Sequence, residues 1–299
     1  MTIDRVRVAA HAKLNLFLRV LAREAEGYHQ VETAFVLLDL SDELVVKREP
    51  GVPRGEVRFA VHGDDTGPAE DNLAVRGARA ALAGLGNPFG VAIELTKRIP
   101  VRAGLGGGSS DAAAALQAIN ALANLAIPRP ELLQYATRLG ADVAFFASGA
   151  PLALAWGRGE RLYRLAPLPT APVLVAVPQV SVATPDAYGW WDEMHPRQVS
   201  RGPVVMDADA LASWGSVGRL GGNDLETPVF GKHPEIRALY ERLAETRPLW
   251  VRMSGSGAAV AAVYRSERER DDAANQIGDR EQRLFRTATC AVPPSGPVG

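Results

Sequence analysis

The chain has 299 residues, of which 47% are hydrophobic and 22% are charged, and its formal net charge at pH 7 is −1. This composition is typical of a globular protein with one large domain or two. The balanced charge argues against a basic nucleic-acid-binding protein and against an acidic tail. The single cysteine, Cys290, excludes an internal disulfide bond and is interpreted as a core residue rather than a nucleophile.

The N-terminal sequence predicts no targeting peptide, because Asp4, Arg5 and Arg7 follow no apolar segment. The uncharged stretch 166–185 contains five prolines, which a membrane-spanning helix would not carry together. We therefore expect a cytoplasmic protein without a membrane span.

The first half of the chain is predicted to mix strands and helices. Leucines alternate with other residues over 14–20, which predicts a half-buried strand with Lys13 and Asn15 side by side on its other face. Further strands are expected at 35–38, 43–47, 57–61 and 91–95. Helices are expected at 72–85 with Asp71 as N-cap, at about 110–125 and at about 131–139.

The second half begins after a proline-rich stretch at 166–172 and is predicted to be a separate domain. Strands are expected at 173–177, 249–253, 259–264 and 283–292, and helices at 185–194, 234–245 and 267–277. Without the polar excursion at 195–222, the order is β-α-β-β-α-β, that of a ferredoxin-like sandwich. The predicted domains are 1–165 and 166–292, followed by a disordered tail at 293–299.

The strongest functional signal is the segment Gly104-Leu105-Gly106-Gly107-Gly108-Ser109-Ser110, which follows a strand and opens a helix. At a helix start the first N–H groups lack intrahelical partners and the dipole is positive. Glycines let the backbone wrap an anion, and two hydroxyls can bond phosphate oxygens or hold Mg²⁺. We interpret the segment as a phosphate-binding loop rather than a flexible loop or a helix cap. It lacks the lysine of a Walker A loop and the later acidic residue of a dinucleotide fold.

Residues 100–113, PVRAGLGGGSSDAA, resemble the P-x-x-x-G-L-G-S/G-S/G-S/A-A motif of the GHMP kinase superfamily. These small-molecule kinases are named after galactokinase, homoserine kinase, mevalonate kinase and phosphomevalonate kinase. The resemblance implies an α+β fold of two domains, a ribosomal-protein-S5-like N-terminal domain and a ferredoxin-like C-terminal domain. It also implies ATP and Mg²⁺, with the metal held by Ser109 or Ser110.

Further segments resemble one branch of this superfamily, which phosphorylates the 2-hydroxyl of a methylerythritol carrying a cytidine diphosphate group in the non-mevalonate isoprenoid pathway. They occur in order at 12–18 (AKLNLFL), 27–29 (GYH), 71–73 (DNL), 139–146 (LGADVAFF), 184–185 (TP), 223–226 (NDLE) and 253–258 (MSGSGA). The implied partner is a small molecule with a cytidine diphosphate group, and neither nucleic acid nor a membrane is expected.

The resemblance implies that Asp142 and Lys13 flank the acceptor hydroxyl. Asp142 would accept the hydroxyl proton, while Lys13 would keep Asp142 ionised and favour the developing alkoxide. The residues themselves support a cationic partner, because Asp142 carries the only charge in the apolar run 139–156 and an unpaired buried carboxylate is unfavourable. A structural salt bridge or a turn aspartate is the alternative.

For the remaining ligand contacts, the resemblance implies that cytosine stacks on Tyr28 and Tyr188 and bonds to His29. Further candidates for substrate binding are Asn15, Thr184, Gly255 and Gly257, and the candidates for adenine are Asn72 and Lys97. Structural alternatives stay open for these residues: packing for the tyrosines, a solvent-facing strand position for Asn15, a place beside a helix cap for Asn72, a surface charge for Lys97, and a hairpin turn for the two glycines.

Two other functions remain open on the sequence. One is a GHMP kinase of the homoserine or mevalonate type, against which Gly27-Tyr28-His29 argues. The other is a catalytically silent nucleotide-binding relative, against which Lys13 and Asp142 argue. The sequence indicates neither the oligomeric state nor the role of the excursion at 195–222.

Overall fold

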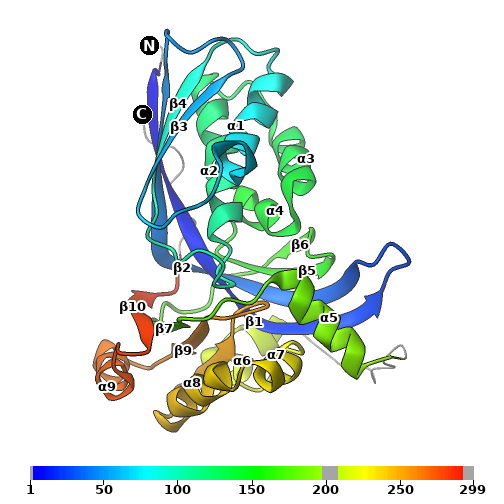
Figure 1. Ribbon diagram of the computed structural model, residues 1–299, viewed down its shortest axis with the longest axis vertical. Helices are drawn as coiled ribbons and strands as arrows, with labels where there is room; N and C mark the ends of the chain where they lie inside the picture. Colours follow the sequence, from blue (N-terminus) through cyan, green and yellow to red (C-terminus); the bar gives the residue numbers. More distant parts are fainter. Residues whose placement is uncertain (1–2, 197–207, 292–299) are drawn as a thin grey trace.

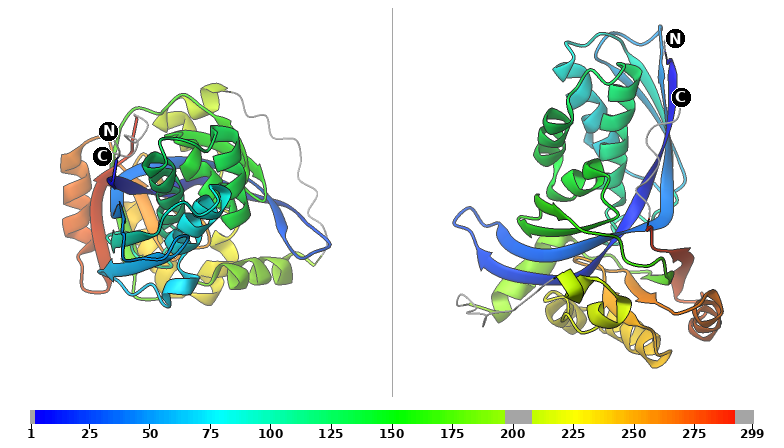
Figure 2. Two further views of the ribbon diagram at one scale, coloured as in Figure 1. Left: turned by 90° about the horizontal axis from the view of Figure 1, so that it is seen from above. Right: turned by 180° about the vertical axis from the view of Figure 1, so that it is seen from behind.

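A computed structural model describes residues 3–196 and 208–291 of the chain (Figure 1). The predicted tail at 293–299 lies outside the described residues, and so does the part of the excursion at 197–207. Two sheets form the molecule: a larger one with helices on one face in the N-terminal half, and a smaller one in the C-terminal half (Figures 1 and 2).

The larger sheet has the strand order β3-β4-β2-β5-β6, with β1 paired to β2. Its strands are β1 (Arg5–Arg23), β2 (His29–Arg48), β3 (Val57–His62), β4 (Val91–Thr96), β5 (Leu152–Gly157) and β6 (Arg161–Arg164). The pair β3–β4 is parallel and the other pairs are antiparallel. The helices that cover this sheet are α1 (Leu73–Gly84), α2 (Gly107–Leu122), α3 (Arg129–Leu139) and α4 (Ala141–Ser148).

The segment 14–20 lies in β1 as a strand, but the prediction that it is half-buried is wrong. Exposed and buried side chains alternate from Arg5 to Ala10, but every side chain from Ala12 to Val20 is buried. The C-terminal sheet covers the face that would otherwise meet water, so that Leu14 packs in one core with Val173. The polar side chains of the alternating pattern, such as Lys13 and Asn15, therefore lie in the interior of the molecule instead of in water.

The smaller sheet has the order β10-β7-β9-β8 and is antiparallel throughout. Its strands are β7 (Pro172–Pro178), β8 (Trp250–Met253), β9 (Val260–Val263) and β10 (Gln282–Ala288). Helices α8 (Pro234–Glu245) and α9 (Glu267–Ile277) complete the β-α-β-β-α-β succession, so the ferredoxin-like prediction is confirmed. Between β7 and α8 lie α5 (Thr184–Met194), η2 (Ala208–Leu211), α6 (Trp214–Val217) and α7 (Glu226–Lys232).

Several element bounds differ from those predicted. The strands expected at 35–38 and 43–47 form the single strand β2. Asn72, rather than Asp71, caps α1, because its Oδ1 accepts a hydrogen bond from the N–H of Ala74 at 2.9 Å. A short helix, η1 (Ala69–Asp71), precedes it. Helix α2 begins at Gly107, three residues before the predicted start at 110, so two glycines lie in its first turn.

Strands β1 and β2 extend beyond the rest of the sheet as a hairpin that passes beside α5, where His29 contacts Asp192 (Figures 1 and 2). The predicted domain boundary at 165/166 falls between β6 and β7 and stays a prediction. Within the described ranges, no helix is both long enough and apolar enough to cross a membrane.

Candidate active site

Two neighbouring cavities share the glycine-rich loop as a common wall. The larger cavity, of about 700 Å³, opens between the β1–β2 hairpin, α4, α5 and the turn after β8. The smaller cavity, of about 320 Å³, lies beside the start of α1 and the segment that precedes α2. Gly104, Gly106 and Ser109 line both cavities. Groups bound in the two cavities would therefore meet at this loop.

The loop needs glycine at two positions for steric reasons. Gly104 has φ +77°, and a Cβ atom there would lie 2.1 Å from the carbonyl oxygen of Ser254. Gly106, with φ +72°, is the N-cap of α2, and its Cβ would lie 2.9 Å from the ring of Phe146. Residues 104–109 all line the smaller cavity, so the first turn of α2 presents its unpaired N–H groups there.

Lys13 and Asp142, predicted to act together, meet in the larger cavity. The Lys13 Nζ lies 3.5 Å from the Asp142 Oδ2, and the two side chains are 5% and 34% exposed. Asp142 lies in the first turn of α4, where the helix dipole favours a carboxylate. The backbone N–H of Lys13 also bonds to the carbonyl oxygen of Leu105 at 3.0 Å, which joins β1 to the loop.

A chain of buried hydrogen bonds fixes the position of the Lys13 ammonium. Its Nζ donates to Asn15 Oδ1 at 2.5 Å, and Asn15 Nδ2 donates to Thr33 Oγ1 at 2.9 Å. Thr33 Oγ1 in turn donates to the carbonyl oxygen of Phe17 at 2.6 Å. Asn15 is only 2% exposed, so the alternative of a solvent-facing strand position is wrong.

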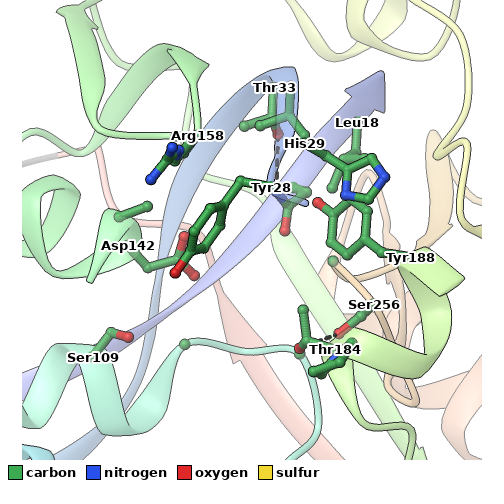
Figure 3. Close-up of a pocket in the computed structure, with 18 of the residues that line it drawn as sticks. Leu18, Tyr28, His29, Thr33, Ser109, Asp142, Arg158, Thr184, Tyr188 and Ser256 are labelled. Carbon is green, nitrogen blue, oxygen red and sulfur yellow. Dashed lines mark hydrogen bonds between the residues drawn. The ribbon is translucent and has the colours of Figure 1, made fainter. Parts of the chain in front are cut away.

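The larger cavity has aromatic walls. Figure 3 shows Tyr28 facing His29 and Tyr188, which stack on each other with ring centroids 4.7 Å apart. The guanidinium of Arg158 lies 3.9 Å from the centroid of the Tyr28 ring, and the Tyr28 residue is still 57% exposed. Burial, and then the negative charges of Asp142 and Asp224, raise the pKa of the Tyr188 phenol above its usual range, so that it stays neutral.

The loop between β8 and β9 closes the larger cavity from the C-terminal half. Gly255 and Ser256 line the cavity, whereas Gly257, also predicted, is not among its lining residues. Ser256 Oγ and Thr184 Oγ1 are 2.9 Å apart and join this loop to the start of α5. Asn223 holds the loop by donating to the carbonyl oxygen of Gly255 at 2.6 Å.

In the smaller cavity, Lys97 belongs to a buried cluster of charges. Its Nζ pairs with Asp42 Oδ2 and lies 2.9 Å from Asp111 Oδ2, and the side chains of all three residues are at most 3% exposed. The alternative of a surface charge for Lys97 is therefore wrong. Asp42 Oδ1 also accepts the backbone N–H groups of Arg98 and Ile99. Asp111 Oδ1 has no hydrogen-bond partner within the described part of the chain.

The two predicted adenine contacts, Asn72 and Lys97, both line the smaller cavity. Asn72 caps α1 through Oδ1 and donates from Nδ2 to Thr66 Oγ1 at 3.1 Å.

The two serines of the glycine-rich loop, Ser109 and Ser110, differ in position. Ser109 lines both main cavities, whereas Ser110 is buried against a separate small cavity beside His11.

Asp111 should make stability depend on pH. Burial raises its pKa to about 7, since the attraction of Lys97, which lowers it, does not offset burial and the repulsion of Asp42. The folded state then binds a proton that the unfolded state releases near pH 4, so this group lowers the free energy of unfolding as pH rises from about 4 to 7.

We therefore expect Asp111→Asn to gain stability relative to the wild type over that pH window and to hold a constant difference above it. The carboxamide keeps an acceptor for Lys97 but carries no charge. Urea unfolding at half-unit steps from pH 4.5 to 8.5 would measure this difference. A difference that is the same at every pH would contradict the raised pKa.

Several residues of the site were missed by the sequence analysis, among them Asp42, Asp192, Arg158 and Asp111. Asp42 and Asp192 carry no local signal, because their partners are Lys97 and His29, which are distant in sequence. Arg158 lies between two glycines in the turn after β5, a pattern that could have marked an exposed functional arginine. Asp111 stands inside the glycine-rich motif, directly after the two serines.

Comparisons with known proteins agree with this architecture. Residues 72–150 match the model of the GHMP kinases N terminal domain, and residues 208–281 match that of the GHMP kinases C terminal. The 4-diphosphocytidyl-2-C-methyl-D-erythritol kinase of Paraburkholderia phytofirmans is 40% identical over 278 residues, which cover 91% of this chain and 90% of the relative.

Solved structures show the same likeness. A crystal structure of 4-(cytidine 5'-diphospho)-2C-methyl-D-erythritol kinase superposes with a TM-score of 0.79 at 35% identity, covering 97% of this chain and 100% of the other. A homoserine kinase from Cytophaga hutchinsonii, at 20% identity, has a TM-score of 0.73 over 100% of this chain and 98% of its own, which shows the fold alone. With relatives of the first kind matching along nine-tenths of its length, the chain belongs to the 4-diphosphocytidyl-2-C-methyl-D-erythritol kinase family, a branch of the ATP-dependent GHMP kinases.

Proposed function

We propose that the chain transfers the γ-phosphoryl group of ATP to the 2-hydroxyl of 4-diphosphocytidyl-2-C-methyl-D-erythritol, as a step of the non-mevalonate isoprenoid pathway in the cytoplasm. The observation that carries the proposal is the meeting of two cavities at the glycine-rich loop, with the Lys13–Asp142 pair on the acceptor side. The names of the relatives support the identity of the substrate.

In this proposal Asp142 removes the proton of the acceptor hydroxyl. The oxygen then forms a bond to the γ-phosphorus, and the bond from that phosphorus to the β,γ-bridging oxygen breaks to release ADP. Lys13, held 3.5 Å from Asp142, places a positive charge beside the acceptor hydroxyl and stabilises the developing alkoxide. Both charged groups lie on the larger cavity next to Gly106 and Ser109, where the terminal phosphate would arrive.

The phosphates of ATP would rest on the first turn of α2, whose free N–H groups and positive dipole suit an anion. Phosphoryl transfer also requires Mg²⁺, which neutralises charge on the phosphate oxygens. The hydroxyl of Ser109 is an oxygen donor of the kind that Mg²⁺ prefers and lies on the wall shared by both cavities. Of the two serines, Ser109 is therefore the one that we propose as the protein contact of the metal.

The cytosine would lie between Tyr28 and the stacked pair of His29 and Tyr188. One face of Tyr28 packs on Arg158, which leaves the other face for a base. Lys13, Arg23 and Arg158 line the same cavity and would attract the diphosphate of the substrate. Asn72 and Lys97 remain the proposed neighbours of adenine, and Lys97 would contact it while paired with Asp42.

The test is a coupled assay of ADP release with four acceptors: the cytidyl substrate, its uridyl counterpart, homoserine and mevalonate. We expect turnover with the cytidyl substrate at least tenfold above the other three in kcat/KM, and ³¹P NMR of the product should show a new phosphomonoester. Turnover of homoserine or mevalonate alone would assign the chain to another GHMP activity. ATP binding without turnover of any acceptor would indicate a silent relative.

A further inference from the structure

A carboxylate from the C-terminal half holds the ring of His29. His29 opens strand β2, and its Nε2 lies 2.7 Å from the Oδ1 of Asp192 in α5, 163 residues further along the chain. The His29 side chain is 8% exposed and that of Asp192 is 21% exposed, so both are largely withdrawn from water. Buried hydrogen bonds to a carboxylate are among the stronger ones in proteins.

The orientation of this carboxylate is itself fixed. Its second oxygen, Oδ2, lies 3.3 Å from the guanidinium of Arg23, which is directly opposite His29 in the β1–β2 register. The imidazole ring stacks on Tyr188 and meets the edge of Trp191, with ring centroids 4.7 and 5.9 Å away. Three residues of one helix therefore hold the ring, and rotation about its χ2 angle would break the contact with Asp192.

The contact also decides which ring nitrogen carries the proton. A carboxylate can only accept a hydrogen bond, so the proton of a neutral His29 must reside on Nε2. Its Nδ1 then has a free lone pair, and no residue within 3–196 or 208–291 bonds to that atom. Because His29 lines the larger cavity, Nδ1 is available to a ligand there as an acceptor.

We infer that Asp192 is a positioning residue that sets the His29 tautomer and thereby makes the cavity prefer cytosine to uracil. Cytosine carries an amino group at C4, which can donate to Nδ1, whereas uracil carries a carbonyl oxygen there, which would face the Nδ1 lone pair. A site that has to hydrogen-bond a ligand group discriminates strongly against a ligand that lacks it. The inference rests on the proposed function, since it assumes that the larger cavity receives the pyrimidine.

The experiment compares the wild type with Asp192→Ala, which removes the acceptor, and Asp192→Asn, which keeps one. Glu193→Gln is the matched control, because Glu193 is the next residue of α5 and its side chain is 67% exposed. For Asp192→Ala we expect the KM for the cytidyl substrate to rise about tenfold, the value of one lost hydrogen bond. The kcat should change less than twofold, since Asp192 does not contact the Lys13–Asp142 pair. The cytidyl-to-uridyl ratio of kcat/KM should fall by a similar factor, and Asp192→Asn should restore part of it.

Side-chain ¹⁵N NMR of the free protein gives a second readout that does not depend on turnover. The wild-type His29 signals should show one tautomer with the proton on Nε2, and Asp192→Ala should shift them toward a mixture. His29→Phe assigns these signals among the five histidines. Unchanged signals in Asp192→Ala, or an unchanged cytidyl-to-uridyl ratio in an active enzyme, would overturn the inference. A wild type that turns over no cytidyl substrate would instead overturn the proposed function, and the NMR comparison would still decide whether Asp192 sets the tautomer.

Discussion

Asp142→Asn should lower kcat for the cytidyl substrate by about 10³-fold, within the range that removal of a general base produces. The carboxamide has nearly the same shape as the carboxylate, but it cannot accept the hydroxyl proton. Affinity for ATP should stay within about twofold of the wild type, because Asp142 lines the larger cavity and not the smaller one. Single-turnover kinetics would measure the chemical step, and calorimetry with a non-hydrolysable ATP analogue would measure binding.

Asp186→Asn is a matched control for this variant. Asp186 lies in the first turn of α5, as Asp142 lies in the first turn of α4, but it is exposed and is not among the lining residues of either cavity. It should keep wild-type kcat. A kcat for Asp142→Asn within tenfold of the wild type would show that the proton leaves by another route.

Lys97→Met should destabilise the protein by about 3–5 kcal/mol, as expected when one partner of a buried ion cluster is removed. Methionine fills a similar volume, so the loss would reflect two buried carboxylates, Asp42 and Asp111, left without their cation. Urea denaturation followed by tryptophan fluorescence would give the free energy of unfolding. Nucleotide affinity should fall too, because the Lys97 ammonium lies beside the glycine-rich loop in the smaller cavity. A Cβ atom built on Gly107 would lie only 3.2 Å from the Lys97 Nζ, which shows how close the two are.

Two further variants test whether the loss of stability in Lys97→Met comes from the buried, unpaired carboxylates. Lys47→Met removes a lysine whose side chain is 42% exposed and whose ion pairs are at the surface, so its cost should stay below about 1 kcal/mol. Adding Asp111→Asn to Lys97→Met should recover part of the lost stability. If Lys97→Met cost no more than Lys47→Met, the cluster would contribute little to folding.

The sequence predicted best those elements whose signal is local. Helices α8 and α9 were predicted with their observed bounds, because an amphipathic or charged run of helical length lies between clear end signals such as Pro234 and Gly278. Strand β2 was predicted as two pieces because polar residues such as Asp39, Ser41 and Asp42 interrupt its apolar pattern. One of these, Asp42, is buried against Lys97, a contact that only the tertiary fold creates.

The residues of the candidate site also fall into those that a local motif indicates and those that only the tertiary fold brings together. The glycine-rich loop, Lys13 and Asp142 lie within contiguous motifs and were predicted from them, and the fold brings them together. The partner of Asp192 is 163 residues away in the chain, so no local pattern could indicate it, whereas the two flanking glycines were the local signal for Arg158. The N-cap of α1 was predicted one residue too early, at Asp71 instead of Asn72. Both residue types are good N-caps, so the sequence does not decide between them and the backbone conformation does.

The loop that joins the two cavities is braced from outside its own half of the molecule. Ser254 Oγ donates to the carbonyl oxygen of Gly104 at 2.9 Å. The backbone N–H of Ala259 donates to the carbonyl oxygen of Ala103 at 3.1 Å. An isolated fragment ending near residue 165 would lack both braces, and its loop would be free to take other shapes. If the loop holds the nucleotide as proposed, we expect such a fragment to bind ATP more weakly than the whole chain does.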